Sequence, residues 1–148
     1  TSLGILAASY IDKGHLVPDD VTNLVLQNAI MNNLDAKGFI FDGYPRTVEQ
    51  VNFLHKLMTA MNIGAIDLVA YLHVSDGELV RRLLERGKET GRSDDASVEL
   101  IAERMKVYEA VIAPVWELYK SRVSYATING LFSVEKVFEL LCEKIDAL

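Results

Sequence analysis

A short segment in the first half of the chain, from Gly38 to Thr47, places an acid, a glycine and an arginine directly after an apolar stretch. Phe39–Phe41 has no polar alternation, which is typical of a strand buried on both faces of a parallel sheet. Asp42 and Gly43 follow at once, and Arg46 comes soon after. Ligands of open α/β sheets bind outside the carboxyl ends of the strands. The segment therefore indicates an anion or metal site, with an ordinary strand–turn–helix corner as the alternative.

The second half of the chain carries four arginines that also indicate an anion site: Arg82, Arg86, Arg92 and Arg104. Arg82 and Arg86 are spaced to share one face of a helix. Gly87 and Gly91 are predicted to end this helix and to frame a loop that carries Arg92. Planar guanidinium groups match phosphate oxygens, so several of them around one cleft suit a polyphosphate ligand. The alternative is a solvated face in which they pair with neighbouring acids, namely Glu85, Glu89, Asp94 and Asp95.

Together these segments resemble the adenylate kinases, within the nucleoside monophosphate kinases. The matching segments occur in the family's order: Gly14–Asp19, Gly38–Thr47 with Gln50, Arg82–Gly87, Gly91–Asp95 and Arg104–Pro114. In relatives that phosphorylate UMP or CMP, an asparagine usually stands where this chain has Thr47. The resemblance therefore implies reversible phosphoryl transfer from ATP to AMP, giving two ADP, in the complete parent protein. A UMP/CMP kinase and a catalytically inactive kinase-like nucleotide-binding module are the alternatives.

The chain departs from the family in one respect. It contains no Gly-x-x-x-x-Gly-Lys-Ser/Thr sequence, which is the phosphate-cradling loop that follows the family's first strand. We therefore expect a three-layer α/β fold of the P-loop kinase type, with a parallel sheet and helices on both faces, whose first strand is missing from this chain. By the same resemblance we expect residues 1–148 alone to be inactive.

The resemblance also implies roles for individual residues. Asp42 would hold Mg²⁺ through water, because Mg²⁺ keeps several waters and needs few carboxylates. Gln50 carries an amide that can both donate to and accept from an adenine edge. AMP would be bound by Val17, Gly43, Arg46, Gln50, Arg92 and Arg104, and ATP by Arg82, Arg86, Gly130 and Phe132. Asp94 is expected to orient Arg92 or its neighbours and not to touch phosphate. The catalytic residues would be Arg86, Arg92, Arg104 and Asp42.

Composition is that of a protein with one substantial core. The 148 residues are half hydrophobic, and one domain, 1–148, is expected, with 1–33 part of the AMP-binding subdomain and 87–96 a short lid loop. The single cysteine, Cys142, excludes an internal disulfide framework and fits a reducing compartment. The net charge of −6 argues against a nucleic-acid partner. We expect a cytoplasmic monomer without a membrane partner, whose ligands are ATP, AMP and ADP.

Helices and strands are predicted to alternate along the chain. The predicted strands are Phe39–Phe41, Leu68–Val74 and Val123–Ile128. The predicted helices are Ile5–Lys13, a helix capped by Asp19 and Asp20, Val48–Met61, Glu78–Arg86, Val98–Tyr119 and Val134–Ile145. In Val48–Met61 the apolar stripe is Val51, Leu54, Leu57, Met58 and Met61. Alternation of this kind predicts parallel strands joined by right-handed crossovers.

Overall fold

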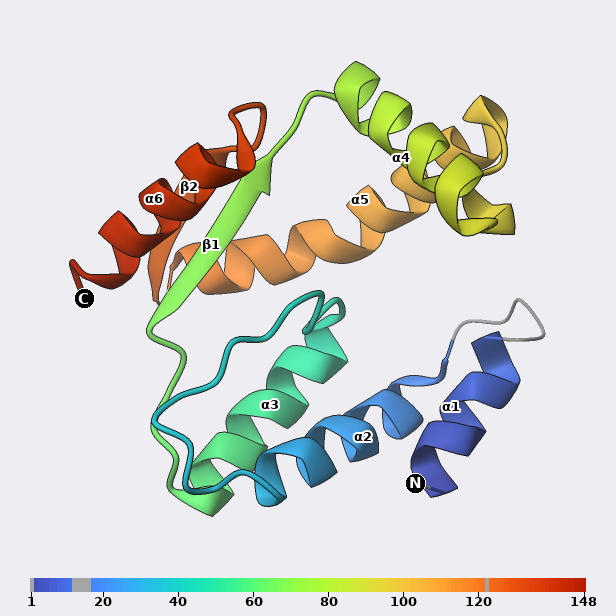
Figure 1. The fold of residues 1–148 in the computed structure, drawn as a ribbon. Coiled ribbons are helices and arrows are strands. Elements are labelled where there is room, and N and C mark those ends of the chain that lie inside the picture. The colour runs from blue at the N-terminus through green and yellow to red at the C-terminus, as the bar shows by residue number, and fades with distance from the viewer. Residues whose placement is uncertain (1, 12–16, 122) are drawn as a thin grey trace. The chain divides into compact units, whose positions relative to one another are not determined.

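The protein is described by a computed structural model that covers residues 2–11, 17–121 and 123–148. It divides into two compact units, Thr1–Ala65 and Ile66–Leu148 (Figure 1). The first unit contains three helices, α1 (Ser2–Ile11), α2 (Asp19–Met31) and α3 (Val48–Met61). Helix α2 packs against both α1 and α3.

Helix α3 has the bounds that its apolar periodicity predicts. Its core-facing residues are buried, namely Val51, Leu54, Leu57 and Met58, and Ile30 of α2 is buried in the same unit. The hydroxyl of Thr47 caps the helix by accepting a hydrogen bond from the backbone N–H of Gln50. Asn62 ends it in the left-handed conformation. Local signals agree with one another here, and the prediction is confirmed.

Two predictions about the first unit are wrong. Phe39–Phe41 is not a strand, and Ile40 is 92 % exposed. A strand requires a neighbour for its backbone groups, and within the described residues no strand pairs with this segment. Asp19 and Asp20 do not cap α2, which follows Pro18 without a side-chain cap, because the carboxylate of Asp19 is bound to residues of α3 instead. The predicted end of the first helix at Lys13 lies outside the described residues.

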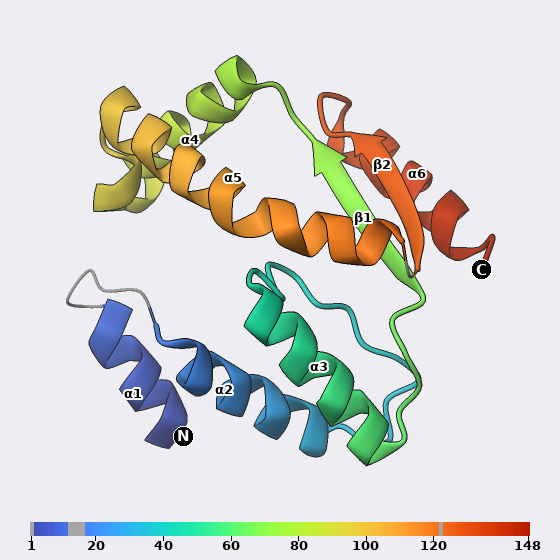
Figure 2. The ribbon, with the colours of Figure 1, turned by 180° about the vertical axis from the view of Figure 1, so that it is seen from behind.

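The second unit is built on a parallel pair of strands, β1 (Leu68–His73) and β2 (Ser124–Asn129). Leu68 lies opposite Ser124, and His73 lies opposite Asn129. Helices α5 (Val98–Lys120) and α6 (Val134–Ile145) lie on opposite faces of the sheet (Figures 1 and 2). Parallel strands with helices on both faces make this an α/β fold, as the sequence predicts. Within the described residues β2 is the only strand that pairs with β1.

Aromatic packing fixes α5 on the sheet. The ring of Trp116 lies 4.7 Å from that of Tyr71 on β1 and 6.1 Å from that of Tyr125 on β2, centroid to centroid. Both contacts have an edge-to-face geometry, which favours aromatic pairs beyond the area they bury. The core of this unit is completed by Ile101, Ile112, Val115, Tyr119, Ala126 and Ile128.

Helix α4 (Asp76–Thr90) is longer than predicted and runs through Gly87, so the predicted loop 87–96 begins too early. The helix ends at Gly91, whose φ of 70° is left-handed, and a short 3₁₀ helix, η1 (Ser93–Asp95), follows. Gly87 has a packing role, since a Cβ there would lie 2.6 Å from the backbone oxygen of Asp95. The absence of a side chain at Gly87 lets η1 pack closely against α4, and the helix continues through this glycine. Over the described residues, every helix is too short or too polar to cross a membrane.

Candidate functional site

The first unit positions Arg46 at the end of the Gly38–Thr47 segment. Its Nε donates a 2.6 Å hydrogen bond to the carbonyl oxygen of Gly43, and the side chain is exposed. Gly43 has a φ of 69°, and a Cβ on it would lie 2.7 Å from Nη2 of Arg46. The left-handed backbone favours glycine, and the close guanidinium adds a smaller constraint because it ends a flexible side chain. No carboxylate of the described residues pairs with Arg46, which leaves its guanidinium open to an anion.

Gln50, one turn into α3, is buried with only 6 % of its surface exposed. Its Oε1 accepts a 2.7 Å hydrogen bond from the backbone N–H of Arg46, and its Nε2 donates a 2.7 Å hydrogen bond to Asp19. The hydroxyl of Tyr44 donates a 2.7 Å hydrogen bond to Asn23 Oδ1 and lies 3.3 Å from the carbonyl oxygen of Gln50. The predicted AMP residues Gly43, Arg46 and Gln50 are thus brought together. Val17 is half-buried just before α2.

Sequence reasoning missed the contribution of Asp19 to this network. Its carboxylate accepts hydrogen bonds from Thr47 Oγ1 and Gln50 Nε2, each at 2.7 Å. One signal was present, because Thr47 and Gln50 have the Ser/Thr-x-x-Glu/Gln spacing of a capping box. That pattern predicts the Thr47 cap and a Gln50 side chain turned back toward the helix start. It cannot predict a partner from α2.

The second unit gathers three of the four arginines around two acids. Asp95 has no exposed side-chain surface, and its Oδ2 accepts a 2.7 Å hydrogen bond from Arg86 Nε. Arg104 Nη1 lies 2.7 Å from Asp95 Oδ1 and donates a 2.6 Å hydrogen bond to Asp94 Oδ2. Arg92 binds both oxygens of Asp94, at 3.0 and 2.8 Å. We call these five residues the lid cluster.

The electrostatics of the lid cluster follow from these contacts. The hydrogen bond from Arg92 is the main reason that the pKa of Asp94 falls to about 2. The hydrogen bond from Arg86 holds the pKa of Asp95 below its ordinary value, although burial of the carboxylate opposes this. The Arg104 contact to Asp95 Oδ1 is close but is not aligned as a hydrogen bond. Both carboxylates are therefore ionised at neutral pH, and three guanidinium groups against two carboxylates make the cluster net positive.

Of the two interpretations of the arginines, pairing with neighbouring acids is confirmed in part, and binding of a phosphate ligand stays a prediction. They pair with neighbouring acids, and yet Arg86, Arg92 and Arg104 keep about a third to a half of their side chains exposed. Asp94 and Asp95 hold the three guanidinium groups together. The pairing with Asp94 confirms that this acid orients Arg92. Arg82 is not in the cluster, because its Nε binds Glu78 Oε1 at 2.7 Å.

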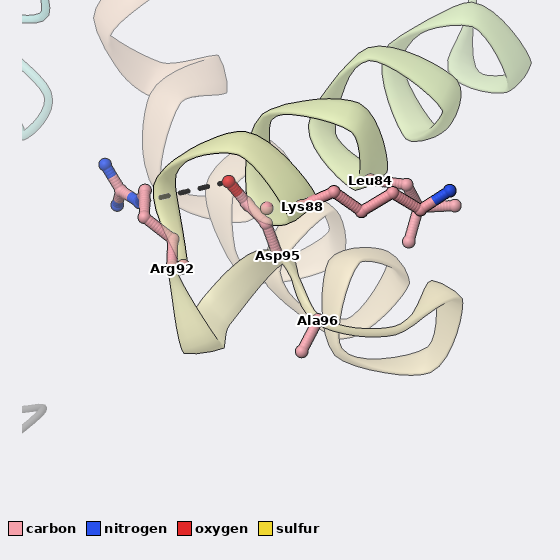
Figure 3. A pocket seen from close by; sticks show the side chains of 7 residues that line it. Leu84, Lys88, Arg92, Asp95 and Ala96 are labelled. Carbon is pink, nitrogen blue, oxygen red and sulfur yellow. Dashed lines mark ion pairs between the residues drawn. The ribbon is translucent and has the colours of Figure 1, made fainter.

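A pocket adjoins the lid cluster. Figure 3 shows Arg92 and Lys88 extending to opposite sides of it, with Asp95 between them. Nε of Arg92 and Oδ2 of Asp95 are 3.9 Å apart. The lining residues are Leu84, Gly87, Lys88, Gly91, Arg92, Asp95 and Ala96.

The loop after β2 carries the last two predicted residues. The backbone N–H of Gly130 donates a 2.8 Å hydrogen bond to the carbonyl oxygen of His73, and a Cβ on Gly130 would lie 2.7 Å from a methyl of Val74. Glycine is therefore needed for the close approach to the end of β1. Phe132 is 48 % exposed, so only part of its ring is packed in the core.

No group of three or more potential metal ligands occurs among the described residues, and the carboxylate of Asp42 is exposed.

A parallel pair of strands covered by helices, a close glycine turn after β2 and clustered arginines are typical of nucleotide kinases. A model of the adenylate kinase family matches residues 1–124. Adenylate kinases from Bacteroides fragilis and Azobacteroides pseudotrichonymphae genomovar. CFP2 are 41 % and 42 % identical to the whole of this chain, which spans 77 % and 76 % of their lengths. An adenylate kinase of Kocuria rhizophila is 39 % identical over 146 residues, 99 % of this chain and 77 % of that protein. The chain belongs to the adenylate kinase family.

Proposed function

We propose that the parent protein of these residues transfers a phosphoryl group reversibly between ATP and AMP, giving two ADP. One observation carries the proposal: the backbone N–H of Arg46 is bound by the side chain of Gln50. A guanidinium suited to the AMP phosphate and an amide suited to adenine are thereby held by the same turn. Family membership and the Thr47–Gln50 spacing support adenine over the pyrimidine bases.

The lid cluster would serve the transferred phosphoryl group. Phosphoryl transfer depends mainly on positioning and on neutralisation of charge, which clustered guanidinium groups supply. Arg86, Arg92 and Arg104 have exposed faces held by two acids, so little reorganisation is needed when phosphate oxygens arrive. We assign Arg82 a lesser role at ATP, because Glu78 already binds it.

Mg²⁺ is the cofactor that we infer, with Asp42 as its partner through water. The exposed carboxylate of Asp42 has no hydrogen bond or ion pair within the described residues, and a single oxygen donor of this kind fits an ion that keeps most of its waters. When bound with nucleotide, Mg²⁺ neutralises phosphate charge. Gly130 and Phe132 would lie beside the adenine of ATP.

The remaining expectations follow from composition and family. We infer a cytoplasmic monomer whose partners are ATP, AMP and ADP, because one cysteine and a net charge of −6 suit a reducing compartment and disfavour nucleic acid. The sequence contains no Gly-x-x-x-x-Gly-Lys-Ser/Thr motif, so we expect the activity of the parent protein and not of residues 1–148 alone.

A coupled assay of the parent protein with ATP, Mg²⁺ and a panel of AMP, CMP and UMP tests the proposal. We expect AMP to be the best acceptor, and Gln50→Ala to weaken discrimination more than it slows the best reaction. Equal or faster rates with CMP would overturn the base assignment. Nucleotide binding without turnover by the parent protein would favour the inactive-module alternative.

A further inference from the structure

Asp19 lies in the first turn of α2, yet its carboxylate serves the start of α3. We propose that Asp19 is a positioning residue that fixes the orientation of the Gln50 amide and so sets the preference of the monophosphate site for adenine. This inference rests on the proposed function, in which Gln50 faces the base. Asp19 itself need not touch the nucleotide.

Two contacts determine which way the amide faces. Asp19 Oδ1 is 2.7 Å from Gln50 Nε2, and the backbone nitrogen of Arg46 is 2.7 Å from Gln50 Oε1. An ionised carboxylate only accepts hydrogen bonds, and a backbone N–H only donates. A flipped Gln50 amide would place its oxygen against the Asp19 carboxylate and its NH₂ group against the Arg46 N–H. Both contacts therefore oppose the flip, and they determine which end of the amide is oxygen and which is nitrogen.

The carboxylate of Asp19 is itself held in place. Its Oδ2 accepts a 2.7 Å hydrogen bond from Thr47 Oγ1, and the same hydroxyl accepts from the backbone N–H of Gln50 at 3.1 Å. Helix α2 follows Pro18 without a side-chain cap, so Asp19 is not engaged at its own helix end. Its two oxygens are thus committed to the turn that carries Gln50.

A fixed amide can distinguish two purines of the same shape. Gln50 keeps one N–H and one lone pair beyond the contacts described. Adenine presents an acceptor at N1 and a donor at its 6-amino group. Hypoxanthine, the base of IMP, presents the opposite pattern, a donor at N1 and an acceptor at O6. An amide held in one orientation suits only one of these patterns, whereas an amide free to flip suits both.

The test compares AMP with IMP as acceptors for the parent protein. Asparagine in place of Asp19 can offer either an oxygen or an NH₂ group, so of the two contacts only the Arg46 N–H still opposes the flip. We expect Asp19→Asn to lower the ratio of kcat/KM for AMP to that for IMP by about tenfold or more, mainly through KM. Asp20→Asn is the matched control, because Asp20 is an exposed acid in the same turn whose side chain has no hydrogen bond or ion pair within the described residues. It should leave the ratio unchanged.

A double variant shows whether Asp19 acts through Gln50. In the Gln50→Ala background, Asp19→Asn should cause no further change in the ratio. A wild-type ratio in Asp19→Asn, or an equal fall in both backgrounds, would overturn the inference. A parent protein that fails to prefer AMP over CMP and UMP would instead overturn the proposed function.

A measurement on the unaltered protein covers the case in which Asp19→Asn does not fold. The side-chain amide protons of Gln50 should exchange with solvent more slowly than those of a free glutamine in the absence of nucleotide, because Nε2 is bound and buried. Exchange as fast as that of free glutamine would refute the positioning role. Slow exchange would support it.

Discussion

Asp95 carries the strongest prediction about stability, because it is a buried carboxylate between two partly exposed arginines. Its side chain has no exposed surface, Arg86 Nε and Nη2 lie 2.7 Å from its Oδ2, and Arg104 Nη1 lies 2.7 Å from its Oδ1. Asp95→Asn keeps the shape and removes the charge. The variant leaves Arg86 and Arg104 facing a neutral group in a site built for an anion.

The size of the effect follows from the contacts. A hydrogen bond to a charged group contributes about 1.5–3 kcal/mol, and Asp95 has one aligned bond and one close ion pair. Both arginines are exposed on one side, which lets water recover part of the loss. We therefore expect Asp95→Asn to lower the free energy of unfolding by about 2–4 kcal/mol. For a protein of this size the melting temperature should fall by roughly 5–15 °C.

The assay is thermal unfolding of the parent protein, followed by circular dichroism, with Asp94→Asn as the matched control. Asp94 binds Arg92 and Arg104, but 44 % of its side chain is exposed, so water can replace it. We expect Asp94→Asn to cost under about 1 kcal/mol. Equal losses in the two variants, or an unchanged melting temperature in Asp95→Asn, would refute the reasoning from burial.

Three further predictions concern the arginines, pH and a glycine. Arg46→Ala should raise KM for AMP with little change in kcat. Arg92→Ala should lower kcat about a hundredfold or more with both nucleotides saturating. Wild-type turnover of Arg92→Ala in steady-state kinetics would contradict the proposed role of Arg92. Because the pKa of Asp94 is lowered from 3.8 to about 2, its contribution to stability is present above its unfolded pKa and should disappear between about pH 4 and pH 2, which urea unfolding across that range would show. Gly87→Ala should cost about 1–3 kcal/mol, because its Cβ would meet the Asp95 backbone. Gly77→Ala in the same helix, where a Cβ has open space, should be neutral or stabilising by up to about 1 kcal/mol in the same melts.

The sequence predicts those elements whose signals are local. The α3 helix is found at the expected residues because its apolar stripe, its Thr47 cap and its left-handed Asn62 all lie within or beside it. Strands β1 and β2 differ from prediction by one residue at their ends, since short apolar runs bounded by turns are typical of parallel strands, although no residue of β1 is buried. The bounds of these elements could therefore be predicted without knowing which distant residues they contact.

The failures occur where a distant contact decides the outcome. Phe39–Phe41 has the composition of a strand, but composition supplies no neighbour for its backbone. A glycine at position 87 suggests a helix end by its type alone, because the sequence does not show that the Asp95 backbone packs against it. Asp19 is an ordinary cap candidate by sequence, and only the packing of α2 against α3 turns its carboxylate toward Gln50. The sequence therefore indicates residue types for a candidate site, whereas the contacts of Asp19 and Asp95 depend on tertiary packing.

The two sets of arginines differ in what a phosphate must displace, and this difference underlies the expected split between KM and kcat. Arg46 is held by a carbonyl oxygen, so an arriving phosphate breaks no ion pair within the described residues. Arg92 and Arg104 share Asp94, which is the exposed acid of the lid cluster, whereas Arg86 is held by the buried Asp95. We expect phosphate oxygens to compete with Asp94 for the open faces of Arg92 and Arg104, while Asp95 remains in place as the fixed counter-charge. Binding of phosphate to Arg46 would therefore stabilise the ground state. Binding to Arg92 would be favourable only where the negative charge of the ligand outweighs the lost contact with Asp94. The transferred phosphoryl group carries charge of this kind in the transition state.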